Sequence, residues 1–194
     1  LVHAGAFISR GHPTLLDDRL HHNDVEPFPD DVTPGFFEPG DVAVSLRNVN
    51  VVFVMEEASE RIKFLSTGVF ARQHDPDFVA GDTLSIYDNL SVGGDRSRIV
   101  KVHAPGNEVT VAYEADDGTF FSHILGKHQR LPNGNLLITE SRAGRAFEVT
   151  PEGDVVWQYV NRVEPGVVGV LTEVTRLSPE VAANFRPDPP GGNR

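Results

Sequence analysis

Short apolar runs that alternate with polar residues recur along most of the chain. Three of them directly follow a tight turn built on glycine with Asp or Asn: DVAVSLRN (41–48), DTLSIYDN (82–89) and NLLITES (135–141). A period of two is typical of β-strands that bury one face. Helical signals are weak and centre on PEVAANF near the C-terminus. The pattern predicts an all-β protein built from antiparallel strands.

These runs belong to a longer repeat. After each of them come two further alternating runs, for example VNVVFVME and RIKFLS in the first unit and GRAFEVTP and DVVWQYV in the last. A histidine stands before each turn, and His21, His74 and His128 are 53 and 54 residues apart. A fixed period of this length is typical of β-propellers, whose blades are four-stranded sheets. We therefore expect three blades over residues 19–68, 69–122 and 126–163.

The segments outside the repeat complete the predicted organisation. The first blade carries an insertion, FPDDVTPGFFE, which we expect to form a loop at its turn. Residues 1–18 form an N-terminal segment, 164–186 a closing strand with a short helix, and 187–194 a flexible tail. Trp157 and Tyr159 are expected to pack in the outer strand of the last blade. Propellers close with about four to eight blades, so we expect a second chain, a second copy or further sequence to complete the ring.

Composition narrows the classes of partner. Lys and Arg number 17 against 28 Asp and Glu, and this net charge of −11 is unfavourable for binding nucleic acid. The sequence has no apolar run long enough for a membrane span. It also has no cysteine, which excludes disulfides, thiolate metal sites and a cysteine nucleophile.

Three short motifs within the repeat suggest a family. They are H-x-N at His21–Asn23, S-x-R ending at Arg47, and Q-H ending at His74. Together with PNGN and GRAFEVTPEG further on, they make the chain similar to the arylsulfotransferases, which are six-bladed β-propellers, over about residues 19–163. By this resemblance a further family histidine falls two blades upstream of His21, before residue 1.

The resemblance implies an activity and a set of site residues. His74 would be the nucleophile that carries the sulfuryl group from an aryl sulfate to a phenol, while His21, Asn23 and Arg47 hold the sulfuryl oxygens. No metal and no nucleotide sulfate donor would be needed, and the family is exported, which implies a periplasmic or extracellular location. His128 matches no family motif. It is a further candidate for substrate binding, with a structural role as the alternative.

The chemistry of these residue types agrees with that implication, although alternatives stay open. Arginine donates to two oxygens of an anion at once, and neutral imidazole is a nucleophile near pH 7. Arg47 could instead pair with Asp24 or Asp88, and Asp88 and Asn89 could simply shape a turn.

Two further alternatives concern the function as a whole. His21, His74 and His128 could together bind zinc, with Asp75 or Asp24 nearby. The chain could also be a non-catalytic propeller that serves as a structural or binding subunit.

Overall fold

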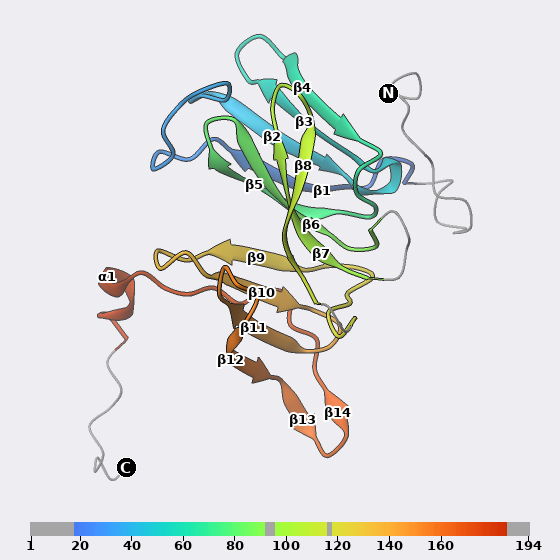
Figure 1. Cartoon of the computed structure of the whole chain (residues 1–194), viewed down its shortest axis with the longest axis vertical. Helices are drawn as coiled ribbons and strands as arrows, with labels where there is room; N and C mark the ends of the chain where they lie inside the picture. The colour runs from blue at the N-terminus through green and yellow to red at the C-terminus, as the bar shows by residue number, and fades with distance from the viewer. Residues whose placement is uncertain (1–17, 92–95, 116–117, 186–194) are drawn as a thin grey trace.

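The computed structural model describes residues 18–91, 96–115 and 118–185, and three four-stranded antiparallel sheets dominate it (Figure 1). The first sheet contains β1 (His22–Pro27), β2 (Asp41–Leu46), β3 (Val51–Glu56) and β4 (Arg61–Thr67). The second contains β5 (His74–Ala80), β6 (Thr83–Asp88), β7 (Arg98–His103) and β8 (Glu108–Glu114). The third contains β9 (Lys127–Arg130), β10 (Leu136–Glu140), β11 (Arg145–Val149) and β12 (Val155–Val160).

Each sheet is a meander in which strands adjacent in sequence are hydrogen-bonded neighbours. The glycine turns join the first strand of a sheet to the second, as the pattern predicts; Gly81 and Asp82 lie between β5 and β6. These sheets are propeller-like blades, and the prediction of an all-β fold is confirmed. Residues 1–17 of the predicted N-terminal segment and the whole predicted tail, 187–194, lie outside the described residues.

The blades pack face to face through two hydrophobic cores. Ala43, Val54 and Phe64 of the first blade meet apolar side chains of the second, such as Ile86 and Val100. The opposite face of the second blade meets the third through a cluster of Tyr87, Ile99, Tyr113, Phe120, Ile138, Phe147 and Val149. Because both faces of the second blade are covered, every residue of β6 is buried. β5 contacts β1 and β2 on one side and β9 on the other, which brings the first strands of the blades together.

The insertion in the first blade forms a loop that is tied into the core. Phe37 is fully buried, and its ring makes edge contacts with Phe64 and Phe78 at centroid distances of 5.7 and 5.3 Å. Its backbone N–H donates to the carbonyl of Gly81 at 2.6 Å. A Cβ added at Gly81 would lie 2.5 Å from the nitrogen of Gly35, so the close approach requires glycine. The loop therefore locks the first blade onto the second.

After the third blade come a short hairpin, β13 (Arg162–Glu164) and β14 (Val167–Val168), then the extended segment 169–177 and helix α1 (Pro179–Ala182). Trp157 and Tyr159 are 42% and 46% exposed, so the expectation that they pack in the blade is wrong. Both lie on the face of the third blade that points away from the second. On that face segment 169–177 bonds to residues of β9, β10 and β11. None of the helices described is both long and apolar enough to cross a membrane.

Candidate functional site

His74 opens β5 at the seam between the first and second blades. It is 9% exposed, and its Nδ1 lies 2.7 Å from Oδ1 of Asn89 and 3.1 Å from the carbonyl oxygen of Arg72. No residue of the described ranges hydrogen-bonds its other ring nitrogen, Nε2. One nitrogen is thus held by the protein and the other remains available for chemistry.

The surroundings of His74 favour its neutral form. Burial lowers its pKa below the ordinary value, and the nearby charges of Arg47 and His21 lower it further. The hydrogen bonds that Nδ1 of His74 makes to Asn89 and to the Arg72 carbonyl raise the pKa, but they do not outweigh burial. An unprotonated imidazole at neutral pH is the form that a nucleophile requires.

Arg47 and His21 are fixed next to each other by the chain itself. The backbone N–H of Arg47, in the single-turn 3₁₀ helix that follows β2, donates to the carbonyl of His21 at 3.0 Å. Nδ1 of His21 lies against the carboxylate of Asp18, whose pKa the His21 hydrogen bond lowers. With Nδ1 engaged in this way, Nε2 of His21 can take part in proton transfer.

Arg47 is a half-buried cation. Burial lowers its pKa, and the neighbouring charge of Arg72 lowers it further. The sequence left open an ion pair with Asp24 or Asp88, but the structure does not form it. Asp24 pairs with Lys127 at 2.9 Å, and no carboxylate within the described ranges lies within 4.0 Å of Arg47. A guanidinium that is desolvated and has no carboxylate partner is prepared to bind an anion.

The other residues of the sequence motifs hold these groups in place. Nε2 of Gln73 donates to Oγ of Ser45 and to the carbonyl of Val51, both at 3.0 Å. Nδ2 of Asn23 donates to the carbonyl of Gln73 at 2.9 Å. The serine two residues before Arg47 and the glutamine before His74 are therefore bonded to each other. His21, Asn23, Arg47 and His74 thus share one seam between blades, as the motif spacing predicts.

Two residues expected to shape a turn differ in role. Asp88 does so, since its carboxylate accepts from the backbone N–H of Ala71 and Ser91, and it also pairs with Arg98 at 2.8 Å. Asn89 instead contacts His74. This contact could not be found from the sequence, because an Asp-Asn pair after a strand is an ordinary turn signal.

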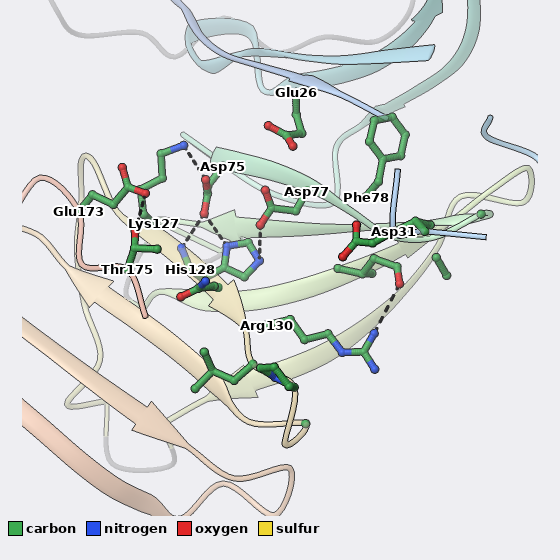
Figure 2. A pocket seen from close by; sticks show the side chains of 18 of the residues that line it. Glu26, Asp31, Asp75, Asp77, Phe78, Lys127, His128, Arg130, Glu173 and Thr175 are labelled. Carbon is green, nitrogen blue, oxygen red and sulfur yellow. Dashed lines mark hydrogen bonds and ion pairs between the residues drawn. The ribbon is translucent and has the colours of Figure 1, made fainter. Parts of the chain in front are cut away.

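His128 lies in a different cluster, shown in Figure 2. Its Nδ1 is 2.8 Å from Oδ2 of Asp75, and its Nε2 is 2.6 Å from Oγ of Ser85 and 3.7 Å from Asp77. Lys127 bridges Asp75 at 2.7 Å and Asp24 at 2.9 Å. Both ring nitrogens of His128 are thus engaged inside the protein.

The repeat explains this difference. His74 lies seven residues before Gly81, whereas His128 lies six before Gly134. β5 also has two register shifts between His74 and Ala80, so that His74 pairs with Tyr87, which faces the third blade, whereas His128 pairs with Ile138, which faces the second. Asp75, Asp77 and His128 are the only metal-competent group within the described ranges. The alternative of a zinc site made by His21, His74 and His128 is therefore wrong.

An open cavity of about 920 Å³ adjoins the His128 cluster, and Glu26, Asp77, Lys127 and Glu173 are among the residues around it. Burial raises the pKa of Asp77 to about 7, with Asp75 and Glu26 adding to the rise. Burial acts on Asp75 in the same direction, but His128 and Lys127 outweigh it and lower its pKa. Burial lowers the pKa of His128, but the hydrogen bond to Asp75 and the charges of Asp75 and Asp77 together outweigh burial and raise it.

Ser85, His128 and Asp75 are aligned in the order of a hydrolase triad, yet the alignment is closed to substrate. Ser85 is 2% exposed and is not among the residues that surround the cavity. A nucleophilic serine has to be reached by the group that it attacks. The three side chains therefore form a buried polar network.

The comparison with protein-family models matches residues 4–162 to the family described as Arylsulfotransferase (ASST). The match spans all four motif residues at the seam. A search of the curated proteins finds no match for this chain.

Proposed function

Because the chain belongs to the arylsulfotransferase (ASST) family, we propose that it transfers a sulfuryl group from an aryl sulfate to a phenol through His74. The observation that carries this proposal is the pairing of a buried imidazole, whose Nε2 is not bonded by a described residue, with the half-buried cation of Arg47. A sulfuryl group spreads negative charge over its oxygens, so its transfer depends on positioned cations and donors.

In the first half-reaction, Nε2 of neutral His74 forms a bond to sulfur while the bond between sulfur and the aryl oxygen breaks. The electron pair of that bond leaves with the phenolate, which takes a proton from His21. Arg47 and the amide of Asn23 bind the sulfuryl oxygens. The product is a sulfurylated His74 whose ring is positively charged, with its proton still on Nδ1.

In the second half-reaction, an acceptor phenol gives its proton to His21 and its oxygen attacks sulfur. The N–S bond breaks, the electron pair returns to Nε2, and His74 is again neutral. Every proton and electron pair is accounted for without a metal or a nucleotide sulfate donor. The family relationship also supports export of the protein to a periplasmic or extracellular location.

The test is release of the chromophore from a chromogenic aryl sulfate, measured with and without a phenolic acceptor. We expect acceptor-dependent release that is lost in His74→Ala, together with a mass gain of one sulfuryl group on wild-type protein that lacks an acceptor. His103→Ala is the matched control, because His103 contacts Thr83 and Thr110 on β7. Release that survives in His74→Ala would overturn the proposal.

We also propose that a second copy or another chain completes the propeller. The support is the surface of the third blade and the segment after it, where large apolar side chains are exposed: Val155, Val156, Trp157, Tyr159, Val163, Val167, Val168, Val170, Leu177, Val181 and Phe185. Apolar surface of this extent marks an interface. Light scattering should report an assembly larger than one chain, which Trp157→Glu with Tyr159→Glu dissociates. If the assembly has no sulfuryl transfer, a binding or structural role remains.

A further inference from the structure

Asn89, just beyond the C-terminal end of β6, is fully buried and makes three side-chain hydrogen bonds. Its Nδ2 donates to the carbonyl oxygens of Ser122 and Leu125, both at 2.6 Å. Its Oδ1 lies 2.7 Å from Nδ1 of His74. The side chain therefore connects His74 to the loop that precedes β9.

These contacts fix the orientation of the amide group. Carbonyl oxygens only accept hydrogen bonds, so the two hydrogens of Nδ2 must be donated to the carbonyls of Ser122 and Leu125. The atom that faces His74 is then necessarily Oδ1, an acceptor. The second neighbour of Nδ1, the carbonyl of Arg72 at 3.1 Å, is also an acceptor. Nδ1 of His74 must therefore carry the proton, which leaves the lone pair on Nε2.

Hydrogen bonds hold both the backbone and the side chain of Asn89 in place. Oγ of Ser97 donates to the Asn89 carbonyl at 2.7 Å and accepts from the backbone N–H of Ser122 at 2.8 Å. Both serines are fully buried. Ser97 thus holds the backbone of Asn89, and the loop with Ser122 and Leu125 holds its side chain. Oδ1 of Asn89 cannot turn away from His74 without breaking several buried hydrogen bonds.

We propose that Asn89 is a positioning residue for sulfuryl transfer: it holds His74 as the tautomer with Nδ1 protonated and stabilises the positive ring formed when Nε2 accepts the sulfuryl group. This inference rests on the proposed function of His74. An uncharged acceptor suits the task because it orients the ring without adding a charge that would keep the ring protonated. At His128 the equivalent partner of Nδ1 is the carboxylate of Asp75.

The first test needs no catalytic activity and no substitution at Asn89. Long-range proton–nitrogen correlation spectra of nitrogen-labelled wild-type protein, with the His74 signals identified by their loss in His74→Ala, report which ring nitrogen carries the proton above the titration of the ring. We expect the proton on Nδ1. A proton on Nε2 would overturn the proposal, whatever the catalytic activity of the protein.

The second test is kinetic. Asn89→Ala should slow formation of sulfurylated His74 from a chromogenic aryl sulfate about 10- to 100-fold, with little change in KM, because it removes support for the ring and leaves the anion-binding groups. The control is Asn133→Ala, in the exposed turn before β10. An unchanged rate in folded Asn89→Ala would contradict the proposal. If the variant fails to fold, the spectra of the wild type decide; if the wild type is inactive, the proposed function fails and the tautomer result still stands.

Discussion

His74 and His128 come from neighbouring blades of one repeat, yet their surroundings are opposite. His74 meets an amide oxygen and a carbonyl oxygen, with the charges of Arg47 and His21 nearby, and its pKa is lowered. His128 meets the carboxylates of Asp75 and Asp77, and its pKa is raised. A repeated histidine is thus no indication of a repeated role.

The comparison shows which property separates a reactive imidazole from a structural one. Uncharged acceptors orient a histidine and leave it neutral, whereas a buried carboxylate turns it into one half of an ion pair. In the His128 cluster Lys127 adds a second cation beside Asp75, so the charges are balanced within the protein. At the seam around His74, the cationic Arg47 lies ready for an anion from outside.

The largest expected effects come from removing each histidine in turn. His74→Ala should lower sulfuryl transfer about 1,000-fold or more, since it removes the nucleophile. It should cost only about 1–3 kcal/mol in the free energy of unfolding, because the buried Oδ1 of Asn89 loses its donor. His128→Ala should instead cost about 3–5 kcal/mol in the free energy of unfolding, because the buried Asp75 loses one of its partners. Urea unfolding and the chromogenic assay on both variants check the contrast. If the two variants had equal effects on transfer and on stability, the distinction between a reactive His74 and a structural His128 would be wrong.

A smaller loss of activity is expected when the cation at the seam is removed. Arg47→Gln should lower kcat about 100- to 1,000-fold, the range found when one donor to a developing anion is lost. The control is Arg61→Gln, because Arg61 is exposed and its carboxylate partner Glu56 is 3.7 Å away. Steady-state kinetics at saturating aryl sulfate measure the effect. A kcat within twofold of the wild type would show that Arg47 does not bind the sulfuryl oxygens.

Removing the hydrogen bonds of Gln73, the residue before His74, should cause a moderate loss of stability. Gln73→Leu removes the bonds to Ser45 and Val51 and leaves their oxygens buried without this partner, which costs about 1–3 kcal/mol. Gln158→Leu, on the exposed strand β12, is the matched control. Chemical unfolding measures the difference in the free energy of unfolding between the two variants. If the two variants are equally stable, the bond between the blades does not fix the seam.

The smallest effect concerns pH and the His128 cluster. Because the pKa of Asp77 rises on folding from 3.8 to about 7, the folded state binds its proton more tightly than the unfolded state does. Stability should therefore fall as pH rises from about 4 to about 7, and Asp77→Asn should flatten this part of the profile. Asp154→Asn, in an exposed turn, is the control. An identical fall in Asp77→Asn would assign it to other groups, such as His128.

Much of the fold followed from local patterns. Alternating apolar residues and glycine turns predicted the strands of each blade, and the H-x-N, S-x-R and Q-H motifs predicted that His21, Asn23, Arg47 and His74 lie together. The hydrogen-bond partners within the site could not be predicted from the sequence. Gln73 meets Ser45 across 28 residues of chain, and Asn89 meets His74 across 15, and neither pair has a spacing that a strand or a turn explains.

The sequence by itself determined the all-β class and the blade repeat, because these depend on the period of apolar residues, and residue type alone suggested the candidate site residues. Tertiary structure alone decided which histidine is neutral. The packing of the third blade against the second directs His128 toward Asp75 and Ser85, while the fold of the second blade brings the Arg72 carbonyl and Asn89 to His74. The charge on an imidazole depends on burial and on neighbours distant in sequence, and the period of a strand does not encode these.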